Sequence, residues 1–195
     1  MRNTQLKSAA LNDTPAVAAR VFGDVYVCPL SLVPDTLKRT GARHLMTLIN
    51  QQTMLATPEG IESGNHLRIA INDINAPQEG LVHASETHVE DVIRFARLWD
   101  RNGALVVHCW AGISRSTAAA FITVCALNPD APEKLIASRL RQASRTATPN
   151  KLLVEIADGI LRRRGRMIDA IAEIGTGESA LEGVPFLLAS SYAQA

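Results

Sequence analysis

The segment 104–122 constrains the fold more strongly than any other part of the chain. It begins with the apolar run Ala-Leu-Val-Val, continues as His-Cys-Trp-Ala-Gly-Ile-Ser-Arg-Ser-Thr at 108–117, and ends with Ala-Ala-Ala-Phe-Ile. The apolar run predicts a buried strand, and the helix-forming residues at the end predict a buried helix. The chain therefore has to pass from a strand through a tight loop directly into a helix.

The loop of this unit predicts an anion-binding site. N–H groups at a helix start have no partner within the helix, and the helix dipole favours negative charge there. If the loop curls round one point, its N–H groups converge on the oxygens of a phosphate. Glycine permits the backbone angles that such a loop needs, and an arginine fork fits two phosphate oxygens. The expected phosphate-binding residues are Trp110, Ala111, Gly112, Ile113, Ser114 and Arg115.

Cys109 lies at the bottom of this expected loop, where the same dipoles stabilise a thiolate. The thiolate would attack phosphorus to give a phosphocysteine, and Arg115 would stabilise charge on the equatorial oxygens. We expect Ser116 to donate a hydrogen bond to the sulfur as it leaves. We expect His108 to orient the loop, because a thiolate made by dipoles needs no general base. The competing interpretation is a buried structural cysteine beside a helix-capping serine.

This segment resembles the signature of the cysteine-dependent protein tyrosine phosphatases, which is His-Cys, five residues, then Arg and Ser or Thr. The form Ala-Gly-x-Ser-Arg-Ser at 111–116 is most similar to the dual-specificity branch. The stretch from Arg145 to Asn150 resembles the Arg…Pro-Asn element that follows the signature in that branch. The resemblance covers roughly residues 20–162.

The leaving oxygen of a phosphate ester also needs a proton donor. Residues 67–73 alternate apolar and polar side chains, which predicts a strand ending at Asp73. Ligands of open α/β sheets gather at the carboxyl ends of the strands, so Asp73 and the loop would share one edge. The resemblance also implies an acid within an Asn-Asp pair some thirty residues before the cysteine, which fits 72–73. The alternatives are Glu79, Glu86 and Asp91, of which the last two fall on a predicted helix.

Apolar periodicity along the chain predicts alternating strands and helices. We expect strands at 21–27, 44–49, 67–73 and 104–108, and helices at 34–39, 84–100, 116–129, 132–143 and 150–163. This order predicts a single α/β domain, with a central, mostly parallel sheet of about four to five strands and helices on both faces.

The expected boundaries are an N-terminal arm at 1–19, a phosphatase domain at 20–174 and a C-terminal tail at 175–195. The tail begins with a Gly-rich linker at 175–183. Its apolar segment 184–188 is expected either to pack on the domain or to contact another subunit. The arginine cluster at 162–166 is interpreted as a solvated face at a helix end, or alternatively as a docking patch for an acidic partner.

Composition narrows the functional classes. The formal net charge of +1 gives no reason to expect a nucleic acid or a membrane as partner, and no uncharged stretch is long enough for a membrane span. Three cysteines form no even disulfide framework, so Cys28 and Cys125 are expected in the core. We expect a cytoplasmic protein, and the alanine-rich, lysine-poor composition favours a bacterial source. We expect no cofactor and no metal, because the remaining histidines lack ligand spacing: His44, His66, His83 and His88.

These observations predict a cysteine-dependent phosphatase that acts on a phosphorylated protein or peptide. The loop has no lysine, which counts against a highly charged substrate. The alternatives are a phosphatase for lipids, nucleotides or RNA 5′-ends, a phosphate-binding module without turnover, and a sulfur-transfer or arsenate-reducing enzyme. The sequence leaves the oligomeric state open.

Overall fold

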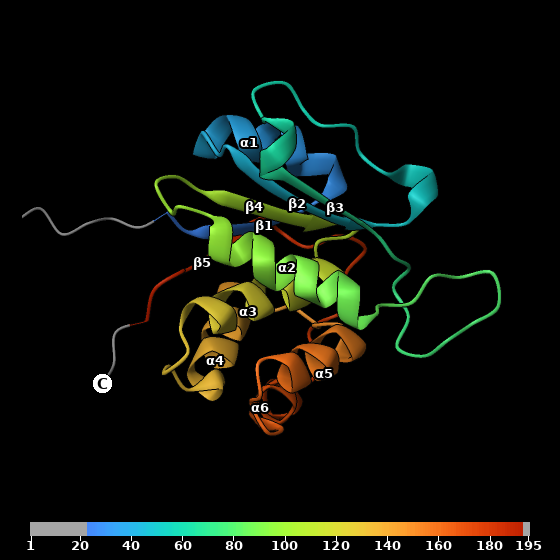
Figure 1. Cartoon of the computed structure of the whole chain (residues 1–195), viewed down its shortest axis with the longest axis vertical. Coiled ribbons are helices and arrows are strands. Elements are labelled where there is room, and N and C mark those ends of the chain that lie inside the picture. Colours follow the sequence, from blue (N-terminus) through green and yellow to red (C-terminus); the bar gives the residue numbers. More distant parts are fainter. Residues whose placement is uncertain (1–22, 193–195) are drawn as a thin grey trace, which may run out of the picture.

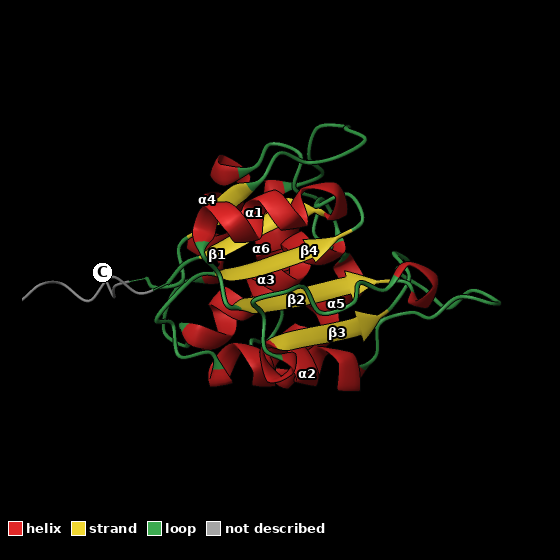
Figure 2. Cartoon of the chain, turned by 90° about the horizontal axis from the view of Figure 1, so that it is seen from above, coloured by secondary structure: helices red, strands yellow, loops and turns green. Residues whose placement is uncertain are grey.

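Five strands form the sheet at the centre of the protein (Figures 1 and 2), in a computed structural model that describes residues 23–192. The order across the sheet is β3-β2-β4-β1-β5, in which the first four strands are parallel and β5 is antiparallel to β1. This arrangement confirms the predicted mostly parallel sheet. The strands are β1 (Val25–Pro29), β2 (His44–Ile49), β3 (His66–Ala70), β4 (Leu105–Cys109) and β5 (Phe186–Leu188).

The described residues also form six α-helices, which cover both faces of the sheet. Figure 1 shows α1 alone on one face and the other five helices on the opposite face, which confirms the predicted layers. Short 3₁₀ turns occupy 30–32, 51–53 and 63–65. The helices are α1 (Val33–Thr40), α2 (Glu86–Leu98), α3 (Arg115–Leu127), α4 (Glu133–Ala143), α5 (Lys151–Ile160) and α6 (Arg166–Ile174).

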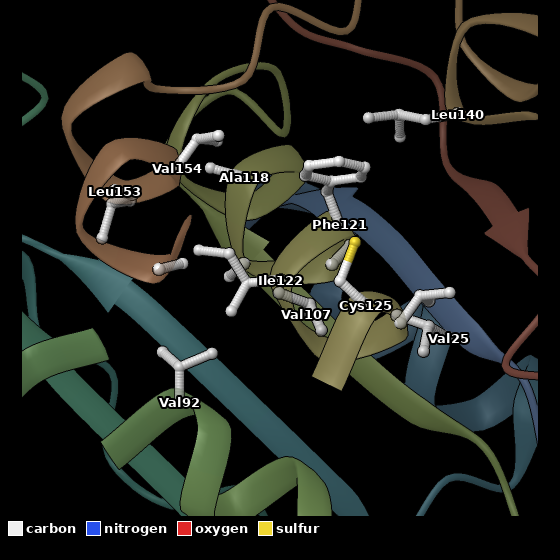
Figure 3. Packing of buried hydrophobic residues seen from close by; sticks show 14 of the residues in the cluster. Val25, Val92, Val107, Ala118, Phe121, Ile122, Cys125, Leu140, Leu153 and Val154 are labelled. Atoms are coloured by element: carbon white, nitrogen blue, oxygen red, sulfur yellow. The ribbon is translucent and has the colours of Figure 1, made fainter. Parts of the chain in front are cut away.

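Helix α3 lies at the centre of the helical layer. Every residue from Arg115 to Cys125 is buried, because the sheet, α2, α4 and α5 all pack against this helix. Figure 3 shows Phe121, Ile122 and Cys125 among side chains from the sheet and from the neighbouring helices. Strand β4 is equally buried, so the loop that joins β4 to α3 is anchored at both ends in the core.

Two predicted strand boundaries were wrong. The strand expected at 67–73 ends at Ala70, because Asn72 instead pairs with Val82 across the following loop, through hydrogen bonds of 2.7 and 2.9 Å. The first strand is Val25–Pro29 rather than 21–27, since its register with β4 begins at Val25. The N-terminal arm expected at 1–19 lies outside the described residues.

The tail packs on the domain. Phe186 and Leu188 are buried where β5 pairs with β1, which is the first of the two arrangements expected for the apolar segment 184–188. The sequence analysis did not assign α6 as a separate helix. Residues 175–183, expected as a Gly-rich linker, are hydrogen-bonded to the domain at several points. We call residues 175–185 the strap.

The interpretation of 162–166 as a solvated face was wrong for Arg163. Its side chain is 6% exposed, and its guanidinium donates to the carbonyl oxygens of Pro129 (2.7 Å) and Cys125 (2.6 Å) and to the carboxylate of Glu133 (2.8 Å). Glu133 is buried as well. Arg163 lies in the turn between α5 and α6. Its hydrogen bonds therefore join this turn to the carboxyl end of α3 and to the start of α4.

We predict that Arg163→Met lowers the free energy of unfolding by about 3–5 kcal/mol, because it leaves the buried carboxylate of Glu133 without its closest cation. Arg164→Met is the matched control, since Arg164 is exposed and its loss should change stability far less. Urea denaturation of both variants measures the difference. Equal losses in the two variants would contradict the role assigned to Arg163.

Candidate active site

The loop between β4 and α3 makes a turn that only glycine fits. Gly112 has a φ of +71°, which favours glycine, and a Cβ built there would lie 2.7 Å from the backbone N of Pro29 and 2.8 Å from the backbone C of Cys28. The loop therefore packs directly against the end of β1. Any side chain at 112 would push the loop away from the sheet.

Four carbonyl groups of the loop point outward and are held by N–H groups from other parts of the chain. The donors come from the end of β1, from the strap and from the segment that leads into α5. The bonds are Leu30 to Trp110 (2.9 Å), Gly183 to Ala111 (2.8 Å), Thr148 to Ile113 (2.9 Å) and Asn150 to Ser114 (3.3 Å).

These outward bonds orient the inner face of the loop. In a planar trans peptide, the carbonyl of one residue and the N–H of the next point in opposite directions. The N–H groups of 111, 112, 114 and 115 therefore face the inside of the loop. Within residues 23–192, those of Ala111, Gly112 and Ser114 donate to no protein group. The loop thus has a ring of free donors at the amino end of α3, where the helix dipole favours an anion.

Cys109 ends β4 at the base of this ring. Its Sγ lies 3.2 Å from the Oγ of Ser116, in the first turn of α3, and the residue is 1% exposed. The hydroxyl of Ser116 can donate to an ionised sulfur at this distance. The structure thus brings Cys109 and Ser116 together at the two ends of the loop.

Arg115 begins α3 beside the ring, and its guanidinium keeps a buried N–H without a hydrogen-bond partner in residues 23–192. Its Nη1 donates to the carbonyl oxygen of Ile71 (2.8 Å), which fixes the guanidinium beside the end of β3. Its Nε is buried and donates no hydrogen bond within the described residues, and the nearest carboxylate oxygen, of Asp73, is 3.7 Å away. A buried guanidinium N–H without a partner is costly, so this donor fits an anion at the loop.

Asp73 reaches the loop although β3 ends before it. Its Oδ1 accepts from the Oγ of Ser114 (2.7 Å) and from the Nδ2 of Asn150 (3.0 Å). Asn150 also caps α5, through a bond of 3.0 Å from the N–H of Leu153 to its Oδ1. The carboxylate of Asp73 is thereby fixed between the loop and α5, and it remains partly exposed.

The other candidate acids do not contact the loop in the described structure. Glu79 is exposed, Glu86 begins α2, and Asp91 pairs with Arg94 on the same helix. Trp110 is 52% exposed, so it forms part of the rim rather than packing below the loop. Of the sequence candidates for the acid, only Asp73 contacts the loop in the described structure.

His108 belongs to a buried chain of hydrogen bonds that runs across the sheet. Its Nδ1 donates to the carbonyl oxygen of Cys109 (3.1 Å), so its Nε2 accepts from the hydroxyl of Thr47 (2.7 Å). The oxygen of Thr47 accepts from Nε2 of His66 (2.8 Å), and Nδ1 of His66 accepts from Thr57 (3.0 Å). With both rings neutral, every hydrogen bond in this series is donated in the direction of Cys109.

The electrostatics agree with neutral rings. Burial lowers the pKa of His108 to about 4, aided by the charge of Arg115, although the bond to the carbonyl of Cys109 acts in the opposite direction. Burial also lowers the pKa of His66 to about 4, and the charge of Arg68 and the proximity of the His108 ring act in the same direction. His108 therefore acts as a fixed donor at neutral pH.

Thr47, His66, Asn150 and Gly183 were not predicted as site residues. Thr47 lies in an apolar strand, where a threonine is an ordinary β-former, and His66 showed only the absence of metal-ligand spacing. Asn150 stood in the Arg…Pro-Asn element, which was the one available signal. Nothing local marks Gly183, because its partner is seventy-two positions away in the chain.

Within residues 23–192, no group of three or more His, Cys, Asp or Glu side chains could hold a metal ion. No helix in that part of the chain is long and apolar enough to cross a membrane. Cys28 and Cys125 are free and buried, as expected for core residues.

The fold is that of the tyrosine and dual-specificity phosphatases. The crystal structure of DUSP15 is similar with a TM-score of 0.52 and 20% identity, over 83% of this chain and 97% of that protein. The PTP-2 phosphatase of Cydia pomonella has a TM-score of 0.54 and 16% identity, over 70% of this chain and 84% of its own. No protein-family model matches the sequence, and a comparison with curated proteins finds no match.

The neutral histidines predict a stability that falls in mild acid. An exposed histidine of the unfolded chain titrates near pH 6.5, whereas His66 and His108 titrate near 4 in the folded protein. Between these values the unfolded state binds more protons, so the stability present above about pH 6.5 is lost as the pH falls toward 4. His66→Gln should reduce this loss, by up to about 1.4 kcal/mol for each pH unit.

Urea denaturation at neutral pH and at steps down to about pH 4 measures this slope. Thr57→Val is the control, because it removes a hydrogen bond to His66 but no titrating group. It should lower the stability at neutral pH and keep most of the slope, because His66 still titrates in this variant. A wild-type slope in His66→Gln would show that the ring does not titrate as described.

Proposed function

We propose that this protein is a phosphomonoesterase that hydrolyses phosphorylated protein through a phosphocysteine intermediate. The observation that carries this proposal is the ring of free N–H groups, together with the unpartnered Nε of Arg115, above the sulfur of Cys109. A tetrahedral dianion satisfies all these donors at once. Within residues 23–192, none of these donors has a hydrogen-bond partner.

In the first step the thiolate of Cys109 attacks phosphorus, and the bond from phosphorus to the ester oxygen breaks. Asp73 gives its proton to the leaving oxygen, since its carboxyl group lies beside the loop on Ser114. The inward N–H groups and Arg115 stabilise the charge on the equatorial oxygens throughout, because they are fixed before the substrate arrives.

In the second step water attacks phosphorus and the bond from sulfur to phosphorus breaks. Asp73, now ionised, takes a proton from this water. The hydroxyl of Ser116, 3.2 Å from the sulfur, donates a hydrogen bond to the thiolate as it leaves. Inorganic phosphate then dissociates and the enzyme returns to its first state.

Three features favour a phosphorylated protein as substrate. Arg115 is the only cation of the loop, so the site has one phosphate to neutralise rather than several. The exposed ring of Trp110 offers an apolar contact beside the phosphate, which a peptide side chain can use. Tyrosine and dual-specificity phosphatases share the fold.

Arsenate reduction is disfavoured by the other two cysteines. A thiol that resolves an intermediate has to be ionised and accessible. Burial raises the pKa of Cys28 to about 11, and burial also raises the pKa of Cys125. Both thiols are buried in the structure, so neither is available to resolve an intermediate of arsenate reduction. The phosphatase mechanism needs no second cysteine.

We predict that Cys109→Ser lowers the hydrolysis of p-nitrophenyl phosphate by about 10³-fold or more, because the hydroxyl is a far weaker nucleophile than the thiolate. Cys28→Ala is the matched control, since it removes a buried thiol outside the loop and should retain activity. Release of p-nitrophenol measures both variants. Turnover in Cys109→Ser at the wild-type rate would end the nucleophile assignment.

We predict that Asp73→Asn lowers kcat about 10²-fold for a phosphotyrosine peptide and much less for p-nitrophenyl phosphate, whose leaving group needs little protonation. The amide oxygen can still accept from Ser114 and Asn150, so the contacts that fix residue 73 can remain. Glu79→Gln is the control for a nearby exposed carboxylate. Equal losses on both substrates would place the general acid elsewhere.

A further inference from the structure

The strap contacts the outer side of the loop, and none of its residues takes part in the two chemical steps proposed above. Within it, the N–H of Gly183 donates to the carbonyl of Ala111 in the loop (2.8 Å). We propose that Gly183 is a positioning residue for catalysis, which fixes the peptide between 111 and 112 so that the N–H of Gly112 faces the phosphate. This inference rests on the proposed phosphatase function.

The peptide between Ala111 and Gly112, which Gly183 holds, is the peptide of the loop that can flip most easily. It precedes a glycine, and glycine accepts both positive and negative φ, so little steric resistance opposes a flip of the peptide. A flipped peptide would direct the carbonyl of Ala111 toward the phosphate and the N–H of Gly112 away from it. The hydrogen bond from the strap opposes this flip, because the carbonyl would lose its donor.

The close fit of the strap against the loop also favours glycine at 183. A Cβ at Gly183 would lie 3.1 Å from the carbonyl oxygen of Gly112 and 3.4 Å from Cγ1 of Ile113. The first distance is tighter than ordinary van der Waals contact, so even a methyl group would press on the loop. Two glycine backbones, one from the loop and one from the strap, therefore lie in direct contact.

A second part of the strap supports another donor of the ring. The N–H of Gly177 donates to the hydroxyl of Thr148 (3.0 Å), and the N–H of Thr148 holds the carbonyl of Ile113. A Cβ at Gly177 would lie 2.5 Å from the backbone C of Thr146. The strap thus packs directly against the loop at 183, and at 177 it packs against residues 145–148, of which Thr148 holds the loop.

Apolar burial does not explain why the strap follows this path. Leu181 is 96% exposed and Val184 is 79% exposed. The strap is held instead by polar contacts: Gly177 to Thr148, Glu178 to Arg145, and Glu182 to Ser31 (2.8 Å), besides Gly183 to Ala111. The strap therefore leaves its apolar side chains in solvent and contacts the loop through its backbone. This arrangement suits a segment that positions the loop.

The test compares two proline variants within the strap. Gly183→Pro removes the N–H that holds Ala111, whereas Leu181→Pro introduces the same ring at an exposed position whose N–H makes no bond in the described chain. We expect Gly183→Pro to lower kcat/KM for p-nitrophenyl phosphate about tenfold and to weaken inhibition by inorganic phosphate several-fold. Leu181→Pro should leave both quantities near the wild-type values.

A purely structural role would lower the thermal midpoints of both variants and leave phosphate inhibition unchanged in the folded protein. That result overturns the proposal. If Gly183→Pro does not fold, Gly183→Ala replaces it, since it keeps the N–H and adds only the Cβ that presses on Gly112. We expect a smaller loss in the same two quantities, and wild-type values in this variant also overturn the proposal.

Failure of the proposed function would be a different result, in which the wild-type protein neither hydrolyses p-nitrophenyl phosphate nor binds phosphate. Backbone NMR tests the strap without reference to catalysis. In the wild type, the amide of Gly183 should exchange slowly with solvent, and residues 110–114 should have the order parameters of a rigid backbone. Fast exchange at Gly183, or a loop equally rigid in Gly183→Pro, would contradict the positioning role.

Discussion

The proposed function depends on the direction in which a few peptide groups of the loop between β4 and α3 are held. Four carbonyl groups of the loop after Cys109 are held outward by N–H donors from the end of β1, from the strap and from the start of α5. Because each peptide is planar, every outward carbonyl turns the next N–H inward. The proposed anion site is therefore shaped by hydrogen bonds on its outer surface. Its inner donors are already arranged when a ligand arrives, which is the condition for strong electrostatic stabilisation of a transition state.

The rest of the fold supports this arrangement. Strand β4 and helix α3 are buried, so the loop between them cannot shift as a unit, and the chain of hydrogen bonds through His108 fixes the carbonyl of Cys109. Asp73 follows β3, which is separated from β4 by β2 in the sheet, and it is joined to the loop by Ser114 and to α5 by Asn150. Segments that are far apart in the sequence thus meet at one edge of the sheet, where parallel strands end.

The sequence predicted what depends on local pattern. The buried strand, the glycine turn and the helix at 104–122 follow from residue type and spacing, and the alternation of strands and helices predicted the layers of the sheet. It could not predict contacts between distant backbones. The end of β3 was misplaced because Asn72 pairs across its loop, and Gly183 went unnoticed because a hydrogen bond from its N–H leaves no trace in composition. Arg163 was read as a surface charge, since only the packed helices show the carbonyl groups that it binds.

The most direct test of this account is a crystal structure of the protein with vanadate, a phosphate analogue that accepts a fifth ligand. The account predicts vanadium bonded to the Sγ of Cys109, with its oxygens accepting from the N–H groups of Ala111, Gly112 and Ser114 and from Nε of Arg115. The four carbonyl groups of the loop should keep their outward partners. Vanadate bound elsewhere, or a loop whose carbonyl groups face the ligand, would contradict the central claim.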